Sequence, residues 1–243
     1  MNKSYPNLLS IVIPTYNEAY NLSPLLALIE QSLVGISHEI IVVDDNSPDG
    51  TGKIADDMVG EYPLVVIHRK GKLGLASAVL EGFKSAGGDI LACMDADLSH
   101  PPELLPVLIE TIVDEGYDMA VASRLAEGAG VVGTWPQYRQ LNSYVATMLA
   151  RPLTPVRDSM SGYFLLRKEV IEGVRLTPLG YKIGLEIMVK GVHQRIKEVP
   201  FLFDNRTQGK SKMDFKVQME YLMHIGNLYS YRLKNIVLGG GRH

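Results

Sequence analysis

The sequence predicts an α/β fold with a mostly parallel central sheet flanked by helices. Short apolar runs alternate with helical segments from residue 8 to residue 123, a rhythm typical of a parallel sheet covered on both faces. A length of 243 residues accommodates one large domain with a C-terminal extension. The hydrophobic fraction of 46% is enough to form the core of such a domain.

The apolar runs predict strands, and the longer periodic segments between them predict helices. In the first half we expect strands at residues 8–14, 39–45, 64–69, 89–95 and 118–123, with helices at residues 21–33, 51–62, 75–85 and 101–115. The glycine-rich segment at residues 125–136 predicts a mobile loop over the sheet edge. Further along we expect a helix at residues 137–149, strands at residues 162–167 and 195–203, and a long amphipathic helix at residues 215–237. The chain is thus predicted to form one domain over residues 1–212 and a C-terminal helical extension over residues 213–243.

Composition and charge exclude several classes of protein. The net charge of −3, without a dominant basic stripe, excludes a nucleic-acid-binding protein. The single cysteine, Cys93, lies inside an apolar run, which excludes an internal disulfide and a cysteine-built metal cluster. We expect no transmembrane helix, because the sequence has no uninterrupted apolar stretch of about 18 residues. It also has no hydrophobic signal segment near its start. We therefore expect the protein in the cytoplasm or, as a peripheral protein, on the cytoplasmic face of a membrane.

Two carboxylates, Asp95 and Asp97, come directly after the apolar run at residues 90–94. A buried strand that ends in this way places both at the carboxyl edge of the sheet, where open α/β folds bind their ligands. Two carboxylates at that edge suit a hard divalent cation such as Mg²⁺ that also holds a substrate diphosphate. The alternative is a helix N-cap, because an aspartate ahead of Pro101 and Pro102 would also start a helix well.

Other strand ends carry polar groups to the same edge. Asp44 and Asp45 end the second predicted strand, and we expect at least one of them to face the cleft. A carboxylate in that place accepts hydrogen bonds from a nucleoside base or ribose. The segment that follows, residues 46–51, carries only turn and cap chemistry. Glu18 lies just beyond the first strand and can face the same crevice.

A segment of small residues follows the third predicted strand. Gly71, Lys72 and Gly74 suit close approach to phosphates, and two cations, Arg69 and Lys70, precede them. The segment is not the G-x-G-x-x-G fingerprint of dinucleotide-binding folds, which counts against an NAD-dependent dehydrogenase.

Together these motifs resemble those of the family 2 glycosyltransferases (GT2), which have the GT-A fold, and within that family the dolichyl-phosphate (polyprenyl-phosphate) mannose synthases. The resemblance runs from residue 8 to about residue 212. The matching segments, in chain order, are residues 14–18 (PTYNE), 44–51 (DDNSPDGT), 95–103 (DADLSHPPE), 158–164 (DSMSGYF) and 206–211 (RTQGKS). The third and fourth of these segments, taken together, are much more specific to the polyprenyl-phosphate branch than to GT2 as a whole.

The resemblance implies a metal-dependent transferase that uses GDP-mannose. Asp95 and Asp97 would form the Asp-x-Asp pair that binds Mg²⁺ or Mn²⁺, with Asp95 also contacting the ribose. Ser99 stands near the metal, at a position where some relatives have glutamine. Asp44 would hold the guanine or the ribose of GDP-mannose. The other residues implied to bind the donor are Pro14, Tyr16, Glu18 and Lys72.

The resemblance also implies a dolichyl or polyprenyl phosphate as the acceptor, and this acceptor decides the mechanism. A phosphate monoester has a second pKa of roughly 6 and is already an anionic nucleophile at neutral pH, so no general base is required. Catalysis then rests on holding two anions together with a metal ion and cations. The expected catalytic residues are Asp97, Arg124 and Arg206, and the acceptor phosphate is expected on Arg139, Ser143, Lys210 and Ser211.

A direct displacement on α-linked GDP-mannose would invert the configuration and give a β-linked polyprenyl phosphate mannose without a covalent enzyme intermediate. We expect residues 158–164 to form a wall on the acceptor side, with Asp158 orienting an arginine or a sugar hydroxyl. Two alternatives remain open. One is transfer of glucose from UDP-glucose to the same lipid phosphate, and the other is a non-catalytic module that binds nucleotide sugars.

Apolar residues of the C-terminal helix recur at roughly helical spacing. This pattern is typical of an amphipathic helix at a membrane interface, and equally of a helix that packs on the core or docks on a membrane partner. In this respect the chain is similar to the short class of relatives without transmembrane helices, which is peripheral or depends on a small membrane-anchoring subunit. The apolar residues are Phe215, Met219, Leu222, Met223, Leu228, Tyr229, Leu233 and Ile236.

Overall fold

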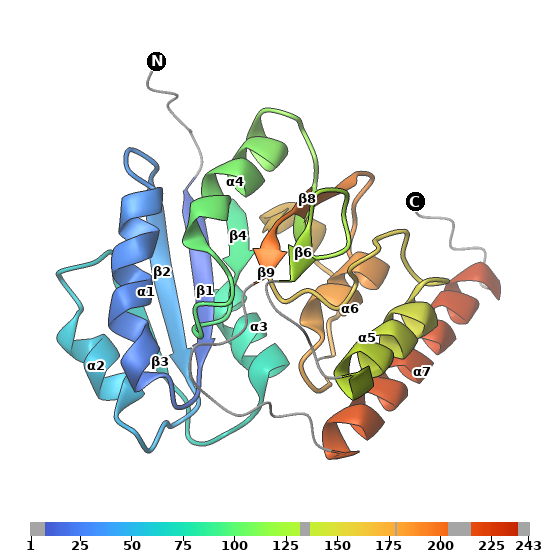
Figure 1. The fold of residues 1–243 in the computed structure, drawn as a ribbon, viewed down its shortest axis with the longest axis horizontal. Helices are drawn as coiled ribbons and strands as arrows, with labels where there is room; N and C mark the ends of the chain where they lie inside the picture. The colour runs from blue at the N-terminus through green and yellow to red at the C-terminus, as the bar shows by residue number, and fades with distance from the viewer. Residues whose placement is uncertain (1–7, 132–136, 178, 204–214, 238–243) are drawn as a thin grey trace.

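A central β-sheet runs through the molecule, with helices on both of its faces (Figure 1). The computed structural model describes residues 8–131, 137–177, 179–203 and 215–237. Within these residues, seven strands form one sheet in the order β3-β2-β1-β4-β7-β5-β8. The strands are β1 (Leu9–Thr15), β2 (His38–Asp44), β3 (Leu64–His68), β4 (Ile90–Cys93), β5 (Met119–Ser123), β7 (Phe164–Arg167) and β8 (Ile196–Pro200).

Seven α-helices connect or flank these strands in the described part of the chain, and two short strands pair beside the main sheet. The short strands, β6 (Gly130–Val131) and β9 (Leu202–Phe203), are parallel to each other. The helices are α1 (Ala19–Ser32), α2 (Thr51–Asp57), α3 (Leu75–Ser85), α4 (Leu105–Val113), α5 (Gln137–Ala150), α6 (Ile183–Lys190) and α7 (Phe215–Val237). Single 3₁₀ turns precede α4 at Pro102–Leu104 and follow β7 at Lys168–Val170.

The two faces of the sheet are covered by different helices because successive side chains of a strand point to opposite faces. Ile11 of β1 belongs to one core cluster together with apolar residues of α1 and α4. The next residue, Val12, belongs to a second cluster together with apolar residues of α3 and α6. Strands β1, β2 and β4 are buried on both faces, which explains their continuous apolar sequences.

The mostly parallel sheet expected from the sequence is confirmed, with β7 as the exception. β7 enters between β4 and β5 and is antiparallel to both. Two elements differ most from the expected ones. The helix expected at residues 51–62 ends at Asp57, ahead of Gly60, which adopts φ 94°. The strand expected at residues 195–203 is divided into β8 and β9, because the chain leaves the main sheet after Pro200 to pair with β6.

Helices α5 and α7 lie side by side at one end of the molecule (Figure 1). The hydroxyl groups of Tyr221 and Tyr229 on α7 donate to the carbonyl oxygens of Ala146 (2.6 Å) and Leu149 (2.9 Å) on α5. Leu228 and Ile225 of α7 join a small apolar cluster with residues that include Leu153, Met160 and Leu185. The C-terminal helix is therefore docked on the domain along one of its faces.

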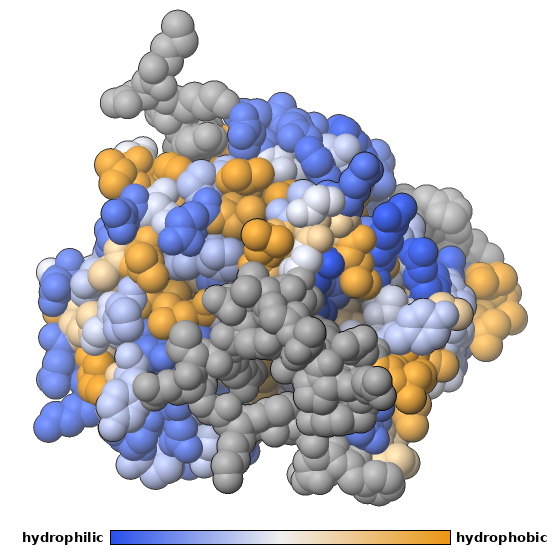
Figure 2. Space-filling model, in the orientation of Figure 1, coloured by the Kyte–Doolittle hydropathy of each residue, from blue (hydrophilic) through white to orange (hydrophobic). Residues whose placement is uncertain are grey.

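The opposite faces of α5 and α7 are apolar and exposed. Apolar side chains gather at this corner of the molecule in Figure 2. The apolar pattern of α7 thus divides in two, since one part packs on the domain and the other does not. Among the described residues, no helix is both long enough and apolar enough to cross a membrane. The exposed residues are Leu141, Tyr144, Val145 and Met148 on α5, and Met219, Leu222, Met223, Leu233, Ile236 and Val237 on α7.

Candidate functional site

The topology brings three of the expected strand ends to one edge of the sheet. The order β3-β2-β1-β4 means that the chain builds outward from β1 in one direction and then returns to its other side with β4. The carboxyl ends of β1, β2 and β4 lie together because these strands are parallel. This is a topological switch point, the place where open α/β sheets bind ligands. The expected convergence of the Glu18, Asp44 and Asp95 segments is confirmed at this level.

Asp44 joins the end of β2 to the end of β1. Its Oδ1 accepts hydrogen bonds from the hydroxyl groups of Thr15 (2.9 Å) and Ser47 (2.5 Å). Its Oδ2 accepts a hydrogen bond from the backbone N–H of Ser47 (2.9 Å). The carboxylate is buried, with 2% of the residue exposed, and its shell of neutral donors sets the shape of this part of the edge.

Asp45 is buried like Asp44, so exposure does not distinguish the two adjacent aspartates. Its Oδ1 forms an ion pair with Arg69 Nη1 at 2.5 Å, and its Oδ2 accepts the N–H of Gly74 at 2.9 Å. The guanidinium also donates to Ser77 Oγ at 2.6 Å. A buried aspartate is tolerated because it is fully paired. Arg69 therefore holds the loop at residues 71–74, and it does not serve as the phosphate-binding cation expected from the sequence.

The same loop carries Lys72 back to the end of β1. Its ammonium group lies 4.2 Å from the ring centroid of Tyr16, within the range of a cation–π contact. Two residues expected to bind the donor are thus brought together from segments more than fifty positions apart in the sequence. Lys72 remains exposed at this point of the edge.

The segment at residues 47–51 caps helix α1 across the sheet edge. The backbone N–H of Glu18 donates to Thr51 Oγ1 (2.9 Å), and that of Ala19 donates to Asp49 Oδ2 (3.1 Å). Burial raises the pKa of the Asp49 carboxyl, but hydrogen bonds from Thr51 and Ala19 outweigh it and leave the pKa below 3.8. The turn and cap role expected for this segment is confirmed, and it satisfies N–H groups at the start of α1.

Asp97 is buried in a tight turn beyond β4. Its Oδ1 accepts hydrogen bonds from the hydroxyl (2.6 Å) and the backbone N–H (3.1 Å) of Ser99. Leu98, between them, has φ 62°, a left-handed conformation that is rare for residues other than glycine and that often marks functional turns. The helix-cap alternative is not supported, because the residues that cap the 3₁₀ turn and α4 are Pro101 and Leu104.

His100 supports this turn, and sequence reasoning assigned it no role. Its Nδ1 accepts the backbone N–H of Asp95 at 2.9 Å, which leaves Nε2 as the protonated nitrogen of the neutral ring. Nε2 lies 3.8 Å from Asp95 Oδ2. The ring stacks on Tyr163 at 4.9 Å between centroids, and Tyr163 donates its hydroxyl to the carbonyl oxygen of Pro101. Burial lowers the pKa of His100, so the ring is neutral at neutral pH.

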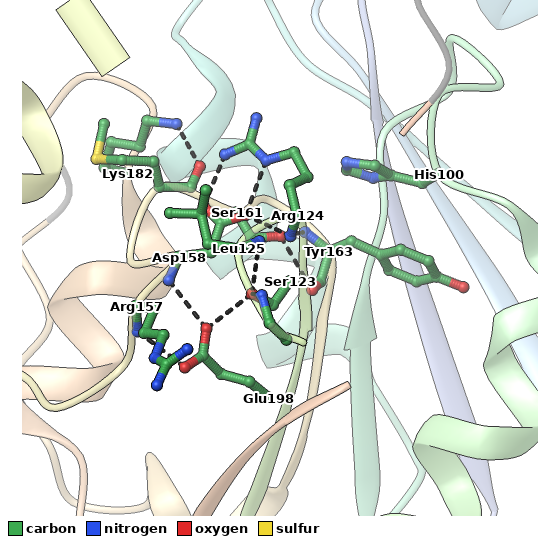
Figure 3. Close-up of polar contacts among 12 residues, drawn as sticks. His100, Ser123, Arg124, Leu125, Arg157, Asp158, Ser161, Tyr163, Lys182 and Glu198 are labelled. Carbon is green, nitrogen blue, oxygen red and sulfur yellow. Dashed lines mark hydrogen bonds and ion pairs between the residues drawn. The ribbon is translucent and has the colours of Figure 1, made fainter. Parts of the chain in front are cut away.

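On the other side of the site, Asp158 forms a bidentate ion pair with Arg124 (Figure 3). Arg124 Nε and Nη2 donate to the two carboxylate oxygens at 2.8 and 2.7 Å, and the Arg124 backbone N–H adds a third bond at 2.9 Å. Burial raises the pKa of Asp158, but the hydrogen bonds and charge of Arg124 outweigh this effect and lower it below 3.8. The expectation that Asp158 orients an arginine is confirmed.

Glu198 of β8 connects this ion pair to Ser123 and Arg157 through hydrogen bonds. No sequence motif predicted a role for it. Its Oε1 accepts from the hydroxyl of Ser123 (2.8 Å) and the backbone N–H of Asp158 (3.0 Å). Its Oε2 accepts from the backbone N–H of Arg157 (2.9 Å). One carboxylate therefore joins the ends of β5 and β8 to the segment that precedes β7, as the dashed lines of Figure 3 show.

Lys182, just before α6, is a second residue that sequence reasoning missed. Its ammonium group donates to the carbonyl oxygen of Met160 at 2.6 Å. Burial, followed by the charge of Arg124, lowers its pKa to about 8, although Asp158 and Asp95 act in the opposite direction. The lysine thus belongs to the same charged group as the arginine–aspartate pair.

The structure describes the side chain of one expected acceptor residue, Ser143, but not those of four others. Ser143 lies on α5 and is half-buried. Arg139 lies on α5, but its side chain is outside the described residues. Three further expected residues, Arg206, Lys210 and Ser211, also lie outside the described residues.

An open α/β sheet with carboxylates at its switch point, and with an ion-paired arginine and a lysine nearby, is the arrangement expected of the GT-A fold. Comparison with known proteins agrees. The chain belongs to glycosyl transferase family 2, whose sequence profile matches residues 10–175.

Two of the relatives named dolichol-phosphate mannosyltransferase match most of this chain. One, from Pyrococcus furiosus, is 48% identical over 226 residues, which cover 91% of this chain and 64% of the relative. The chain thus spans less than two thirds of that protein. The other, from Saccharomyces cerevisiae, is 39% identical over 243 residues, which cover 94% of this chain and 90% of the relative.

Among solved structures, the chain is similar to a mannosyltransferase from Pyrobaculum calidifontis in complex with GDP-Man and Mn²⁺. The TM-score is 0.62 at 17% sequence identity, and the match covers 95% of this chain and 65% of that chain. At this identity the likeness establishes the fold, and it confirms the expected GT-A architecture.

Proposed function

We propose that the protein transfers mannose from GDP-mannose to dolichyl or polyprenyl phosphate with inversion, giving a polyprenyl β-mannosyl phosphate. The observation that carries the proposal is the pair of Arg124 and Asp158, which presents a fixed guanidinium beside the Asp95–Asp97 turn. A planar guanidinium held in this way suits a phosphate acceptor. The names of the two relatives support the same acceptor and the same sugar.

The donor is proposed to bind along the ends of β1, β2 and β4. The contact between Lys72 and Tyr16 supports a place for phosphates and nucleoside at the end of β1. Asp44, which links β1 and β2, is proposed to contact the nucleoside or to shape its pocket through Ser47. The full set of proposed donor contacts is Pro14, Tyr16, Glu18, Asp44, Lys72 and Asp95.

A divalent cation, Mg²⁺ or Mn²⁺, is proposed to bind at Asp95 and Asp97. Among the described residues, no group of three or more histidine, cysteine or carboxylate side chains could hold a metal ion by itself. Two carboxylates on one turn instead fit a cation that shares its remaining ligands with substrate phosphates. When bound, the ion would neutralise charge on the departing diphosphate. Ser99 is proposed to act beside the ion, since its hydroxyl orients Asp97.

The acceptor phosphate is proposed to bind beside Arg124. A phosphate monoester carries its own negative charge near neutral pH, since its second pKa is about 6. The protein therefore has to position the nucleophile and offset the repulsion between two anions. Arg124 is proposed to do so from the described side of the site. The other proposed contacts are Arg139, Ser143, Arg206, Lys210 and Ser211.

The lipid chain of the acceptor is proposed to lie at a membrane surface against the exposed apolar faces of α5 and α7. Two neighbouring helices present Tyr144, Met148, Met223 and Ile236 to the outside, each more than half exposed. Burial of apolar surface stabilises such contact by about 25 cal/mol per Å². The protein would then act as a peripheral protein on the cytoplasmic membrane face, and a small membrane-anchoring subunit could cover the same surface.

A transfer assay tests the proposal. The protein is incubated with a short polyprenyl phosphate, Mg²⁺ or Mn²⁺, and radiolabelled GDP-mannose or UDP-glucose. We expect lipid-linked mannose, no lipid-linked glucose, and a β-anomeric signal in the NMR spectrum of the product. Glucose transfer would contradict the proposed donor, and an α-linked product would contradict inversion. Nucleotide binding without transfer from either donor, in the presence of lipid vesicles, would instead indicate a non-catalytic binding module.

A further inference from the structure

Lys182 is a charged residue at the site for which neither the sequence motifs nor the proposed reaction gave a role. It is the residue immediately before α6, and its backbone has φ −106° and ψ 55°. Its ammonium group lies 4.4 Å from the ring centroid of Tyr181 and donates to the carbonyl oxygen of Met160. Met160 belongs to the segment at residues 158–164, the expected acceptor-side wall. The side chain is therefore held at this wall by α6.

The Lys182 ammonium group lies near another cation, Arg124, and near the carboxylates of Asp158 and Asp95. The carboxylate of Asp158 is fully engaged by Arg124. Among the described residues, no carboxylate lies within 4.0 Å of the Lys182 ammonium group. By contrast Lys190, on the same helix, pairs with Glu186 at 2.5 Å. A desolvated cation is costly unless it is paired, so the position of Lys182 is suited to receiving an anion.

The hydrogen-bonding capacity of Lys182 leads to the same conclusion. An ammonium group has three N–H donors, and Met160 accepts from one of them. Burial and the neighbouring guanidinium lower the pKa of the lysine from 10.5 to about 8. The group is thus mostly charged at neutral pH, and binding of an anion beside it would raise its pKa again.

We propose that Lys182 binds the phosphate of the acceptor directly, next to Arg124. This inference rests on the proposed function and adds a residue to it. Arg124 is oriented by Asp158, while Lys182 forms no ion pair with a described carboxylate and keeps N–H donors for an incoming phosphate. The acceptor is favoured over the donor diphosphate because Lys182 is attached to the segment at residues 158–164. The described donor-side cation, Lys72, lies instead on the far side of the Asp95–Asp97 turn, beside Tyr16.

Steady-state kinetics of Lys182→Met test the proposal. Loss of one charge-assisted phosphate contact should raise the KM for polyprenyl phosphate about 10- to 100-fold. The KM for GDP-mannose should change by less than about 2-fold, because Lys182 is not proposed to contact the donor. Lys182→Arg, which keeps the charge, should recover part of the acceptor affinity.

Lys168→Met is the matched control. Lys168 is also half-buried, and its ammonium group also donates to a backbone carbonyl, that of Ala86 at 2.9 Å. It follows β7 at the opposite edge of the sheet, since its backbone pairs with Asp89 ahead of β4. This variant should leave both KM values unchanged. Thermal unfolding of the two lysine variants shows whether either change acts through stability.

A pH profile gives an independent readout. The acceptor kcat/KM of the wild type should fall above about pH 8, as the free Lys182 loses its proton. In Lys182→Arg this limb should move to higher pH. The charged and titratable groups that face Lys182 are Arg124, Asp158 and Asp95, the adjacent Tyr181, and Tyr221 and His224 of α7.

The outcomes separate this inference from the proposed function. Absence of transfer by the wild type would contradict the function itself. If the wild type is active, an unchanged acceptor KM in Lys182→Met would overturn the inference alone. A selective rise in the KM for GDP-mannose would also overturn it and would assign Lys182 to the donor. Should Lys182→Met be inactive, calorimetric titration of the folded variant with a short polyprenyl phosphate and GDP decides, because affinity equal to the wild type contradicts the proposal.

Discussion

The two sides of the site are built in different ways. On the proposed donor side, Asp97 is bound by Ser99 and Asp44 is bound by Ser47, two and three positions away, and Asp44 is also bound by Thr15 of β1. On the acceptor side, Arg124 is bound by Asp158 at a separation of 34 residues. Asp158 is in turn bound by Glu198 at a separation of 40 residues.

The charges differ as well. The donor side presents carboxylates that are held mainly by hydroxyl and backbone N–H groups, and this arrangement suits a bound cation. The acceptor side presents a guanidinium and an ammonium group, of which the first is neutralised by a buried carboxylate. Local turns at Ser47 and Ser99 thus help to shape the proposed metal-binding half, whereas these contacts of the proposed anion-binding half join distant segments.

The largest effect is expected for the donor-side carboxylate Asp97. Asp97→Asn should lower the rate of mannose transfer on the order of 10³-fold, because a bound metal ion supplies several kcal/mol of charge stabilisation. The rate is measured with saturating Mn²⁺ and both substrates. Asp57→Asn, an exposed carboxylate on α2, is the control and should retain wild-type activity. Activity of Asp97→Asn within about tenfold of the wild type would refute a metal role for this turn.

The ion pair of the acceptor side should contribute more to stability than the neutral shell of the donor side. Asp158→Asn should lower the free energy of unfolding by about 3–5 kcal/mol, since it removes the charge of the buried carboxylate that pairs with the Arg124 guanidinium. Asp44→Asn should cost about 1–3 kcal/mol, because its partners are hydroxyl and N–H groups. Urea denaturation of both variants measures the difference. Equal losses, or a greater loss for Asp44→Asn, would show that the ion pair of Asp158 does not stabilise the protein more than the hydrogen bonds of Asp44.

The pH dependence of stability sharpens this comparison. The pKa of Asp158 is lower in the folded protein than its ordinary value of 3.8. Its ionisation therefore contributes stability that is present above that ordinary value and is lost as the pH falls through the lower folded value. The stability gap between the wild type and Asp158→Asn should narrow as the pH falls below about 4. A gap that is constant between pH 6 and pH 3 would be inconsistent with the ion pair.

A smaller effect is expected for His100, which supports the Asp95 turn from behind. His100→Phe keeps the stacking on Tyr163 but removes the acceptor for the Asp95 N–H. Loss of such support should weaken Mn²⁺ binding about 10- to 100-fold, measured by titration in the presence of GDP. His100→Asn, whose side-chain oxygen can accept a hydrogen bond, should be less affected. Unchanged Mn²⁺ affinity in His100→Phe would show that the turn is held without the histidine.

The smallest effect on stability is expected beside the acceptor side, on the exposed face of α7. Met223→Gln should change the free energy of unfolding by less than about 0.5 kcal/mol, whereas Leu228→Ala on the packed face should cost about 2–5 kcal/mol. The same Met223→Gln change should weaken sedimentation with anionic lipid vesicles. A large loss of stability in Met223→Gln would mean that this face is covered within the protein itself.

The parts of the fold that could be predicted are those determined by local sequence. The first five strands of the main sheet along the chain follow directly from apolar runs that end in polar residues. The carboxyl-edge position of Asp95 and Asp97 follows from the direction of their strand. The turn at Asp49 follows from turn chemistry, because its carboxylate accepts from the N–H and the hydroxyl of Thr51 two residues on.

The parts that could not be predicted depend on which distant segments meet. The antiparallel insertion of β7 leaves no trace in the sequence, since a short buried strand reads alike in either direction. At least one of Asp44 and Asp45 was expected to face the cleft, and the pairing with Arg69 that buries Asp45 could not be read from the sequence. Glu198 and Lys182 lie outside every motif, and their roles appear only when β8 and α6 are placed beside residues 158–164.

The late insertion of β7 also has a consequence for synthesis. β1 to β4 can pair once residue 93 has left the ribosome, because these four strands and their mutual contacts all lie before that point. The outer edge of β4 then stays unpaired until residues 164–167 have been made, some seventy residues later. An open edge is a template for pairing with other chains. A nascent chain that stalls within this interval would expose the β4 edge to aggregation, and the His100–Tyr163 stack behind the Asp95 turn would not yet exist.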